Sequence, residues 1–124
     1  MEEQEKFMQL QMLDRQYSQT AEQLQMIEQE VVELDEFVKS LNHIEDSKET
    51  GMLAPLGRGV YVSAERELNE KLFVEVGAGV VVRKTIKEAV SVVSEQLEQL
   101  KAAYHQLKNQ EAFFAAQLQQ IMSN

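Results

Sequence analysis

Residues 51–84 of this 124-residue chain read GMLAPLGRGVYVSAERELNEKLFVEVGAGVVVRK. All five glycines and the single proline of the chain lie in this stretch, and all fifteen glutamines lie outside it. Glycine and proline interrupt helices and favour turns, so the two kinds of sequence should form different structures. The distribution predicts two glutamine-rich helices, over residues 1–48 and 85–123, joined by a non-helical segment.

Four short apolar or β-branched runs make up the central segment, at residues 52–56, 60–64, 72–76 and 80–84. Glycine-containing turns, Gly57-Arg58-Gly59 and Gly77-Ala78-Gly79, separate the first run from the second and the third from the fourth. This spacing predicts two β-hairpins. Four short strands cannot bury two faces, and their edges expose unpaired backbone groups. We therefore expect an oligomer to complete this sheet.

Both flanks carry residues alternately three and four positions apart, the seam of a heptad repeat. The first seam comprises Leu10, Leu13, Tyr17, Thr20, Leu24, Ile27, Val31, Leu34, Val38 and Leu41. The second comprises Ile86, Val90, Val93, Leu97, Leu100, Tyr104, Leu107, Glu111, Phe114, Leu118 and Ile121. A stripe this narrow favours a coiled coil over a helix lying on a globular core. Glu111 is either a register device or a polar residue tolerated near a loosening tip.

The two helices are of similar length, about 60 Å each at the rise of an α-helix. Joined by a compact connector, they most simply fold back antiparallel, so that both chain ends meet at one tip. Thr85 followed by Glu88 predicts a capping box at the start of the second helix. The sequence thus predicts an α+β fold: a long antiparallel two-helix coiled coil joined by a small β-module of two hairpins.

Charge and composition exclude several classes of function. The net charge is −9 with a pI near 4.7, and residues 1–50 hold 13 acidic and 4 basic side chains. This balance argues against binding nucleic acid or anionic lipid. The absence of cysteine removes disulfides, thiolate metal sites and thiol nucleophiles. With no apolar run of about 20 residues and an acidic start unlike a signal peptide, we expect a soluble cytoplasmic protein.

Other candidate motifs favour ordinary structural roles. Gly77-Ala78-Gly79 begins like a dinucleotide fingerprint, but Val82 replaces its third glycine, and a hairpin turn explains the glycines better. His43 and His105 lack carboxylate partners at ligand spacing and are expected on the surface rather than on a metal. The acidic cluster of Glu30, Glu33, Asp35 and Glu36 is better explained as a solvated helix face than as a site for a cationic partner. We expect no catalysis, cofactor or metal.

The central segment resembles the prefoldin family, specifically its alpha-type subunit in an archaeal-like form. The resemblance covers about 35 residues and rests on Pro55-Leu56-Gly57, Gly59-Val60-Tyr61-Val62, Val74-Glu75-Val76-Gly77-Ala78-Gly79, and Val82-Arg83-Lys84 leading into Glu88-Ala89. Two hairpins in the connector, rather than one, place the chain on the alpha side. On this resemblance, residues 1–124 form a single prefoldin-like domain, with helices over 1–48 and 85–123 and hairpins over 51–84.

The resemblance also implies a function and partners. It implies a hexamer of two alpha-type and four beta-type subunits, in which the hairpins assemble into an oligomeric β-barrel carrying the coiled coils. It implies an ATP-independent chaperone that holds unfolded polypeptides at the coiled-coil tips and delivers them to a group II chaperonin. On this resemblance, the contacts between subunits are made by apolar residues of the β-module: Leu56, Val60, Tyr61, Val62, Leu72, Val74, Val76, Val80 and Val82.

The residues near both chain ends indicate an interaction site independently of the family. Client binding is assigned to Phe7, Met8, Leu10, Met12, Phe113, Phe114, Ile121 and Met122. Five of them, Phe7, Met8, Met12, Phe113 and Met122, stand off the seam and would face water, and exposed flexible thioethers suit promiscuous binding. Alternatively, the seam frays and these side chains pack between the helices. A structural scaffold or filament-forming subunit that transfers no client is the competing function.

Overall fold

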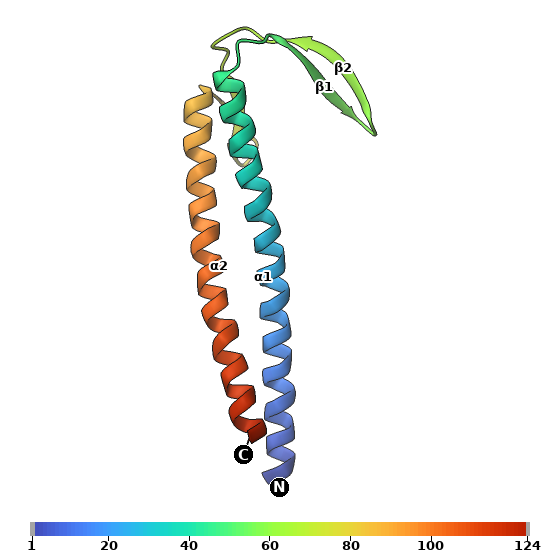
Figure 1. The fold of residues 1–124 in the computed structure, drawn as a ribbon, viewed down its shortest axis with the longest axis vertical. Helices are drawn as coiled ribbons and strands as arrows, with labels where there is room; N and C mark the ends of the chain where they lie inside the picture. Colours follow the sequence, from blue (N-terminus) through green and yellow to red (C-terminus); the bar gives the residue numbers. More distant parts are fainter. Residues whose placement is uncertain (1, 124) are drawn as a thin grey trace. The chain divides into compact units, whose positions relative to one another are not determined.

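The computed structural model describes residues 2–123. Its elements, in chain order, are α1 (Glu2–Asp46), β1 (Gly51–Gly57), β2 (Val60–Glu65), β3 (Leu72–Gly77), β4 (Val80–Lys84) and α2 (Ile86–Ser123). The prediction of two long helices joined by two hairpins is confirmed. Figure 1 shows the two helices and the hairpin of β1 and β2. The contacts divide the chain into two compact units. We call Met1–Leu34 with Gln96–Asn124 the helical unit and Asp35–Glu95 the hairpin unit.

In the helical unit, the first part of α1 and the second part of α2 run side by side in opposite directions (Figure 1). The described beginning of α1 and the described end of α2 therefore share one end of this unit. Every seam residue that the heptad pattern assigns to the unit is buried or half-buried. Leu24 and Leu97 are 5% and 6% exposed. The narrow stripe is thus the whole core here, which is the packing expected of a coiled coil.

The two polar residues of the seam are accommodated differently. Thr20 is buried, and its hydroxyl donates a hydrogen bond of 2.8 Å to the main-chain oxygen of Gln16 one turn earlier. The hydroxyl therefore enters the core with its donor satisfied. Glu111 stays half-buried, with its carboxylate 3.5 Å from the Lys108 ammonium. Each polar group thus has a partner within its own helix.

The predicted capping box is present at the start of α2. The Thr85 main-chain N–H donates to the Glu88 carboxylate at 3.2 Å, and the Glu88 N–H donates to the Thr85 hydroxyl at 3.1 Å. Two N–H groups that have no partner inside the helix are satisfied in this way. Hydrogen bonding with Thr85 holds the pKa of the Glu88 carboxyl below its ordinary value. The bond with the Thr85 backbone has the larger effect, and the bond with its side chain the smaller.

The two hairpins repeat one local design. β1 pairs antiparallel with β2, and β3 with β4, as two separate two-stranded sheets. Each hairpin closes through two residues with positive φ: Arg58 and Gly59 (52° and 80°), and Ala78 and Gly79 (51° and 76°). Positive φ at both positions is the signature of a type I′ turn. In each hairpin a bulge falls on the strand that leads into the turn, between Pro55 and Gly57 or between Glu75 and Gly77.

The hairpins differ in what covers them. On β3, Leu72 and Val74 pack against a small core formed by Leu41 of α1 with Ile86 and Ala89 of α2. Alternation along the strand leaves Phe73 on the opposite face, 71% exposed, with the Arg83 guanidinium 5.4 Å from the centre of its ring. In β1 and β2 no side chain is buried and only the two alanines are half-buried. The first hairpin therefore has no core within its own chain.

Candidate functional site

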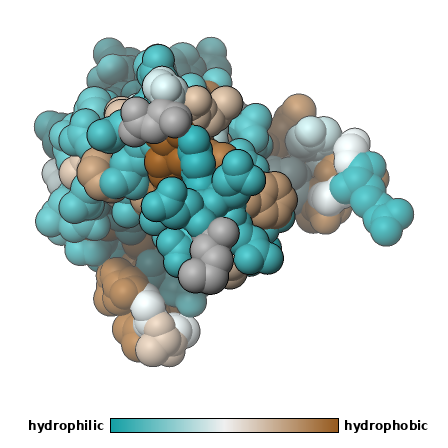
Figure 2. Space-filling view, turned by 90° about the horizontal axis from the view of Figure 1, so that it is seen from below, coloured by the Kyte–Doolittle hydropathy of each residue, from teal (hydrophilic) through white to brown (hydrophobic). Residues whose placement is uncertain are grey.

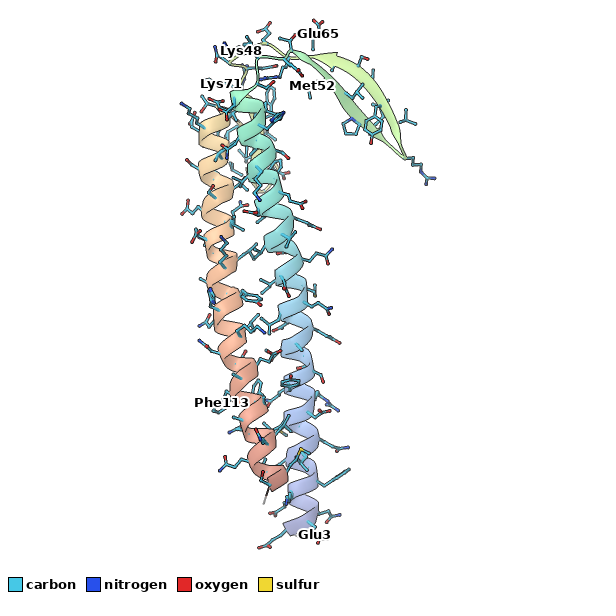
Figure 3. The ribbon with its side chains drawn as sticks, viewed as in Figure 1. Glu3, Lys48, Met52, Glu65, Lys71 and Phe113 are labelled. Atoms are coloured by element: carbon cyan, nitrogen blue, oxygen red, sulfur yellow. The ribbon has the colours of Figure 1, made fainter. Side chains whose placement is uncertain are left out.

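Large apolar side chains are exposed where the described ends of α1 and α2 meet. Their exposed fractions are 59% for Phe7, 64% for Met8, 65% for Met12, 57% for Phe113 and 73% for Met122. Viewed from that end, brown apolar surface interrupts the teal hydrophilic surface (Figure 2). The side chain of Phe113 lies on the outer side of α2 (Figure 3). In this structure these five side chains do not pack between the helices, so the fraying alternative does not describe them.

The other three residues assigned to client binding lie on the seam. Leu10, Phe114 and Ile121 are half-buried between the helices. Phe114 meets its neighbour Phe113 edge to face, with ring centres 5.9 Å apart. A half-buried seam residue thus contacts an exposed one, in the edge-to-face arrangement that aromatic pairs prefer. The eight assigned residues therefore form an outer exposed set on a half-buried base.

One side of this end is hollowed into a groove of about 270 Å³. Three apolar side chains line it, the half-buried Leu13 of α1 and Ile121 of α2 and the exposed Met12 of α1. Four carboxamides line it as well, from Gln9, Gln16, Gln117 and Gln120. Both Gln9 and Gln16 stand one residue before a seam residue, as does Gln117 on α2, which places them on the same side of the coiled coil. We call this feature the amide groove.

The opposite side of the helical unit is charged. Residues that directly follow the second seam position of each heptad include Asp14 and Glu28 on α1, and Lys101 and Lys108 on α2. Glu28 and Lys101 line one shallow hollow together with Tyr104 and His105. Lys101 and Lys108 have their carboxylate partners on α2 itself, Glu98 at 4.0 Å and Glu111 at 3.5 Å, so these charges do not pair the two helices. The two sides of the coiled coil therefore differ in chemistry, a difference that the sequence analysis missed although the heptad frame contains it.

The residues assigned to assembly divide into two groups. Leu56, Val60, Tyr61, Val62, Val76 and Val80 are exposed, whereas Leu72, Val74 and Val82 are half-buried. Two members of the second group, Leu72 and Val74, already contact the small core of the hairpin unit. Further exposed apolar side chains of the hairpins were not assigned from the sequence: Met52, Leu53, Phe73 and Val81. Met52 lies near the open end of the first hairpin, close to Glu65 (Figure 3).

Metal-binding clusters and membrane-spanning helices are the two remaining kinds of feature at issue in the described residues. Within residues 2–123 no group of three or more histidine, aspartate or glutamate side chains is arranged to hold a metal ion. His43 and His105 are both exposed, and His105 lies edge to face with Tyr104 at 5.9 Å. Neither α1 nor α2, over its described length, has a stretch apolar enough to cross a bilayer.

Comparison with known proteins gives one consistent result. A family model described as "Prefoldin: Prefoldin subunit" matches residues 6–124. A protein named Prefoldin subunit alpha from Methanococcus maripaludis is 29% identical over 107 residues, which cover 86% of this chain and 73% of that protein. A protein of the same name from Thermofilum pendens is 30% identical over 114 residues, covering 86% of this chain and 87% of that protein.

A solved structure shares the fold. A chain in the cryo-EM structure of filamentous PFD from Methanocaldococcus jannaschii matches with a TM-score of 0.78. The match covers 91% of this chain and 94% of that chain, at 17% sequence identity. At this identity the likeness shows the arrangement of helices and hairpins, and it carries no statement about activity or partners.

Proposed function

This chain belongs to the prefoldin family of chaperones, and from that membership we propose that it is an alpha-type subunit that holds unfolded polypeptides without ATP. We take residues 1–124 as one prefoldin-like domain acting in the cytoplasm. The proposed assembly contains two alpha-type and four beta-type subunits, and the held polypeptide passes to a group II chaperonin. The proposal needs no catalytic residue, cofactor or metal.

The observation that carries this proposal is the set of five exposed apolar side chains at the shared end of the two helices: Phe7, Met8, Met12, Phe113 and Met122. Exposed apolar surface of this kind marks interaction sites on otherwise hydrophilic proteins. Methionine fits varied apolar surfaces because its side chain is unbranched, flexible and polarizable. Leu10, Phe114 and Ile121 support the site from the seam. Such a surface suits partners that share exposed apolar residues rather than a defined shape.

Weak contacts from several subunits explain holding and release together. One end offers only a few apolar side chains, so a client bound to a single subunit should dissociate quickly. Contacts with several subunits of one complex raise the overall affinity through high effective concentration. Each contact still opens and closes independently, so transfer to another chaperone requires no nucleotide.

The test uses the chain assembled with beta-type subunits and measures suppression of aggregation of a chemically denatured protein without ATP. An end variant replaces Phe7, Met8, Met12, Phe113 and Met122 by alanine. A matched control replaces Met26, Val32 and Phe37 by alanine, because these are 69%, 53% and 49% exposed but lie elsewhere on α1. We expect the end variant to lose most of its suppression and the control to keep it. Equal suppression by both, at unchanged oligomer mass, would refute holding at this end.

Filament formation is a second candidate function, favoured by one observation. The first hairpin carries exposed apolar side chains on both faces, since the consecutive strand residues Met52 and Leu53 are 45% and 64% exposed. The solved chain with the same fold comes from an assembly described as filamentous. Mass measurement and electron microscopy of the chain without beta-type subunits separate the two candidates. Long polymers whose activity survives the end substitutions would favour the filament role.

A further inference from the structure

The amide groove differs from a plain apolar patch in its lining. Met12, Leu13 and Ile121 supply apolar surface, and both α1 and α2 contribute carboxamides to it. A carboxamide donates two hydrogen bonds and accepts two, as an uncharged group. Among residues 2–123, no side-chain hydrogen bond of the structure uses one of these four carboxamides, and the Thr20 hydroxyl donates to the main-chain oxygen of Gln16 rather than to its side chain. The amide groups of the groove are therefore available to a bound partner.

An extended polypeptide matches this combination of groups. Its backbone presents an N–H donor and a C=O acceptor at every residue except proline, and its side chains point alternately to opposite sides. Its apolar side chains would contact the apolar part of the lining, while its backbone groups pair with the glutamine amides. Recognition of this kind uses what all unfolded chains share, namely unpaired backbone groups, and requires no particular sequence.

Charge around the groove limits which segments fit. No charged side chain lines the groove itself. The neighbouring hollow, which shares Gln9 and Ile121 with it, is lined by Glu2, Glu3 and Lys6. Two carboxylates beside the groove disfavour an acidic segment through like-charge repulsion. The geometry therefore favours uncharged or basic segments over acidic ones.

We propose that the amide groove binds the backbone of an extended, uncharged polypeptide segment through its glutamine carboxamides. The inference rests on the proposed function, since it names how the same end of the molecule recognises its client. It adds hydrogen bonding to the client backbone as a source of affinity beside apolar contact. One hydrogen bond contributes little net free energy in water, about 2- to 10-fold in affinity, so two facing amides should have a measurable effect.

The test compares two fluorescent peptides of the same uncharged apolar sequence, one with normal backbone and one with alternate backbone nitrogens methylated. Methylation removes N–H donors and keeps the side chains. The full complex is used as wild type and as the pair Gln16→Leu with Gln117→Leu, which replaces amides by apolar groups of similar size. The control pair is Gln29→Leu with Gln106→Leu, because both residues are exposed but do not line the groove.

We expect wild type and the control pair to bind the normal peptide roughly 5- to 10-fold more tightly than the methylated one. The Gln16/Gln117 variant should bind both peptides with equal affinity. Equal binding of both peptides by wild type would overturn the inference and leave the proposed function standing. Failure of wild type to bind either peptide would overturn both. Self-association of the complex could also block peptide binding. A doubled mass in wild type that the Gln16/Gln117 variant lacks would overturn the inference and assign the groove to a second copy of the chain.

Discussion

The guanidinium of Arg66 donates a hydrogen bond of 3.0 Å to the carbonyl oxygen of Ile44, 22 residues earlier in the chain. The same group donates to the carbonyl oxygens of Ser47 at 2.8 Å and Glu49 at 3.1 Å. The last carbonyl groups of a helix have no partner within it, and that end of the helix attracts positive charge. Arg66 directly follows β2, so its hydrogen bonds satisfy carbonyl groups at the end of α1 and join that end to the end of β2.

Substitution of Arg66 by lysine should lower the free energy of unfolding by about 1–3 kcal/mol. Lysine keeps the charge, but its ammonium group cannot reach three carbonyl oxygens that the planar guanidinium contacts together. Arg58→Lys is the matched control, because Arg58 is exposed in a turn and should change stability by less than about 0.5 kcal/mol. Urea unfolding followed by circular dichroism measures both changes. Equal losses in the two variants would contradict the role given to Arg66.

Acidification should weaken the start of α2 through Glu88. The pKa of its carboxyl is lower in the folded chain than in the unfolded chain. Its contribution is therefore fully present above the unfolded value of about 4.3, and it is lost as the pH falls through the lower folded value. In Glu88→Gln this dependence should disappear, because the amide does not titrate. Thermal midpoints recorded from neutral to acidic pH should fall more steeply for wild type than for the variant, and parallel curves would contradict the prediction.

The second hairpin turn should respond in opposite directions to two substitutions. Ala78 has a φ of 51°, which asparagine tolerates better, and Asn-Gly is a preferred pair in type I′ turns. Ala78→Asn should therefore stabilise the chain by about 0.5 kcal/mol. Gly77 has a φ of 126°, and although a Cβ there would touch nothing within 4 Å, Gly77→Ala should cost about 1–2 kcal/mol through backbone strain. Differential scanning calorimetry of the assembled complex should show a higher unfolding temperature for Ala78→Asn and a lower one for Gly77→Ala. A higher unfolding temperature for Gly77→Ala would contradict the strain assigned to that position.

The coiled-coil seam should be far more sensitive than its outer surface. Leu24 is 5% exposed and Met26 is 69% exposed, two residues apart on the same helix. Leu24→Ala should reduce the free energy of unfolding by about 2–4 kcal/mol, through lost apolar contact and the cavity left behind. Met26→Ala should change it by less than about 0.5 kcal/mol. Chemical denaturation of both variants gives the comparison, and similar losses would mean that the helices pack in another register.

Much of the fold could be predicted from local sequence patterns. The heptad spacing identified the seam, including Thr20 and Glu111, because a helix places every third and fourth residue on one face. The capping box of Thr85 and Glu88 involves residues three apart, so their sequence spacing was sufficient to predict it. The strand motifs pointed to the prefoldin family, and that prediction is confirmed by the family match over residues 6–124.

The candidate site was predicted only in outline. The heptad frame separated the five off-seam residues, among them Phe7, Met8 and Met122, from the three on the seam, and the structure finds the five exposed and the three half-buried. Spacing alone left open whether the off-seam side chains pack between fraying helices. The amide groove escaped prediction because the residues that line it are about one hundred positions apart in the sequence. The three carbonyl bonds of Arg66 were missed for a related reason, since a single arginine in a polar linker carries no periodic signal.

By itself, the sequence determined the helices, the hairpins, the seam and the family, because each depends on residues close together in the chain or on a motif in fixed order. The tertiary structure decided that the off-seam side chains at the ends do not pack between the helices, which residues of α1 and α2 meet in one groove, and what closes the end of α1. These features arise where distant segments meet. Their physical basis is the pairing of two helix faces and the reach of one guanidinium, and neither follows from spacing along a single strand or helix.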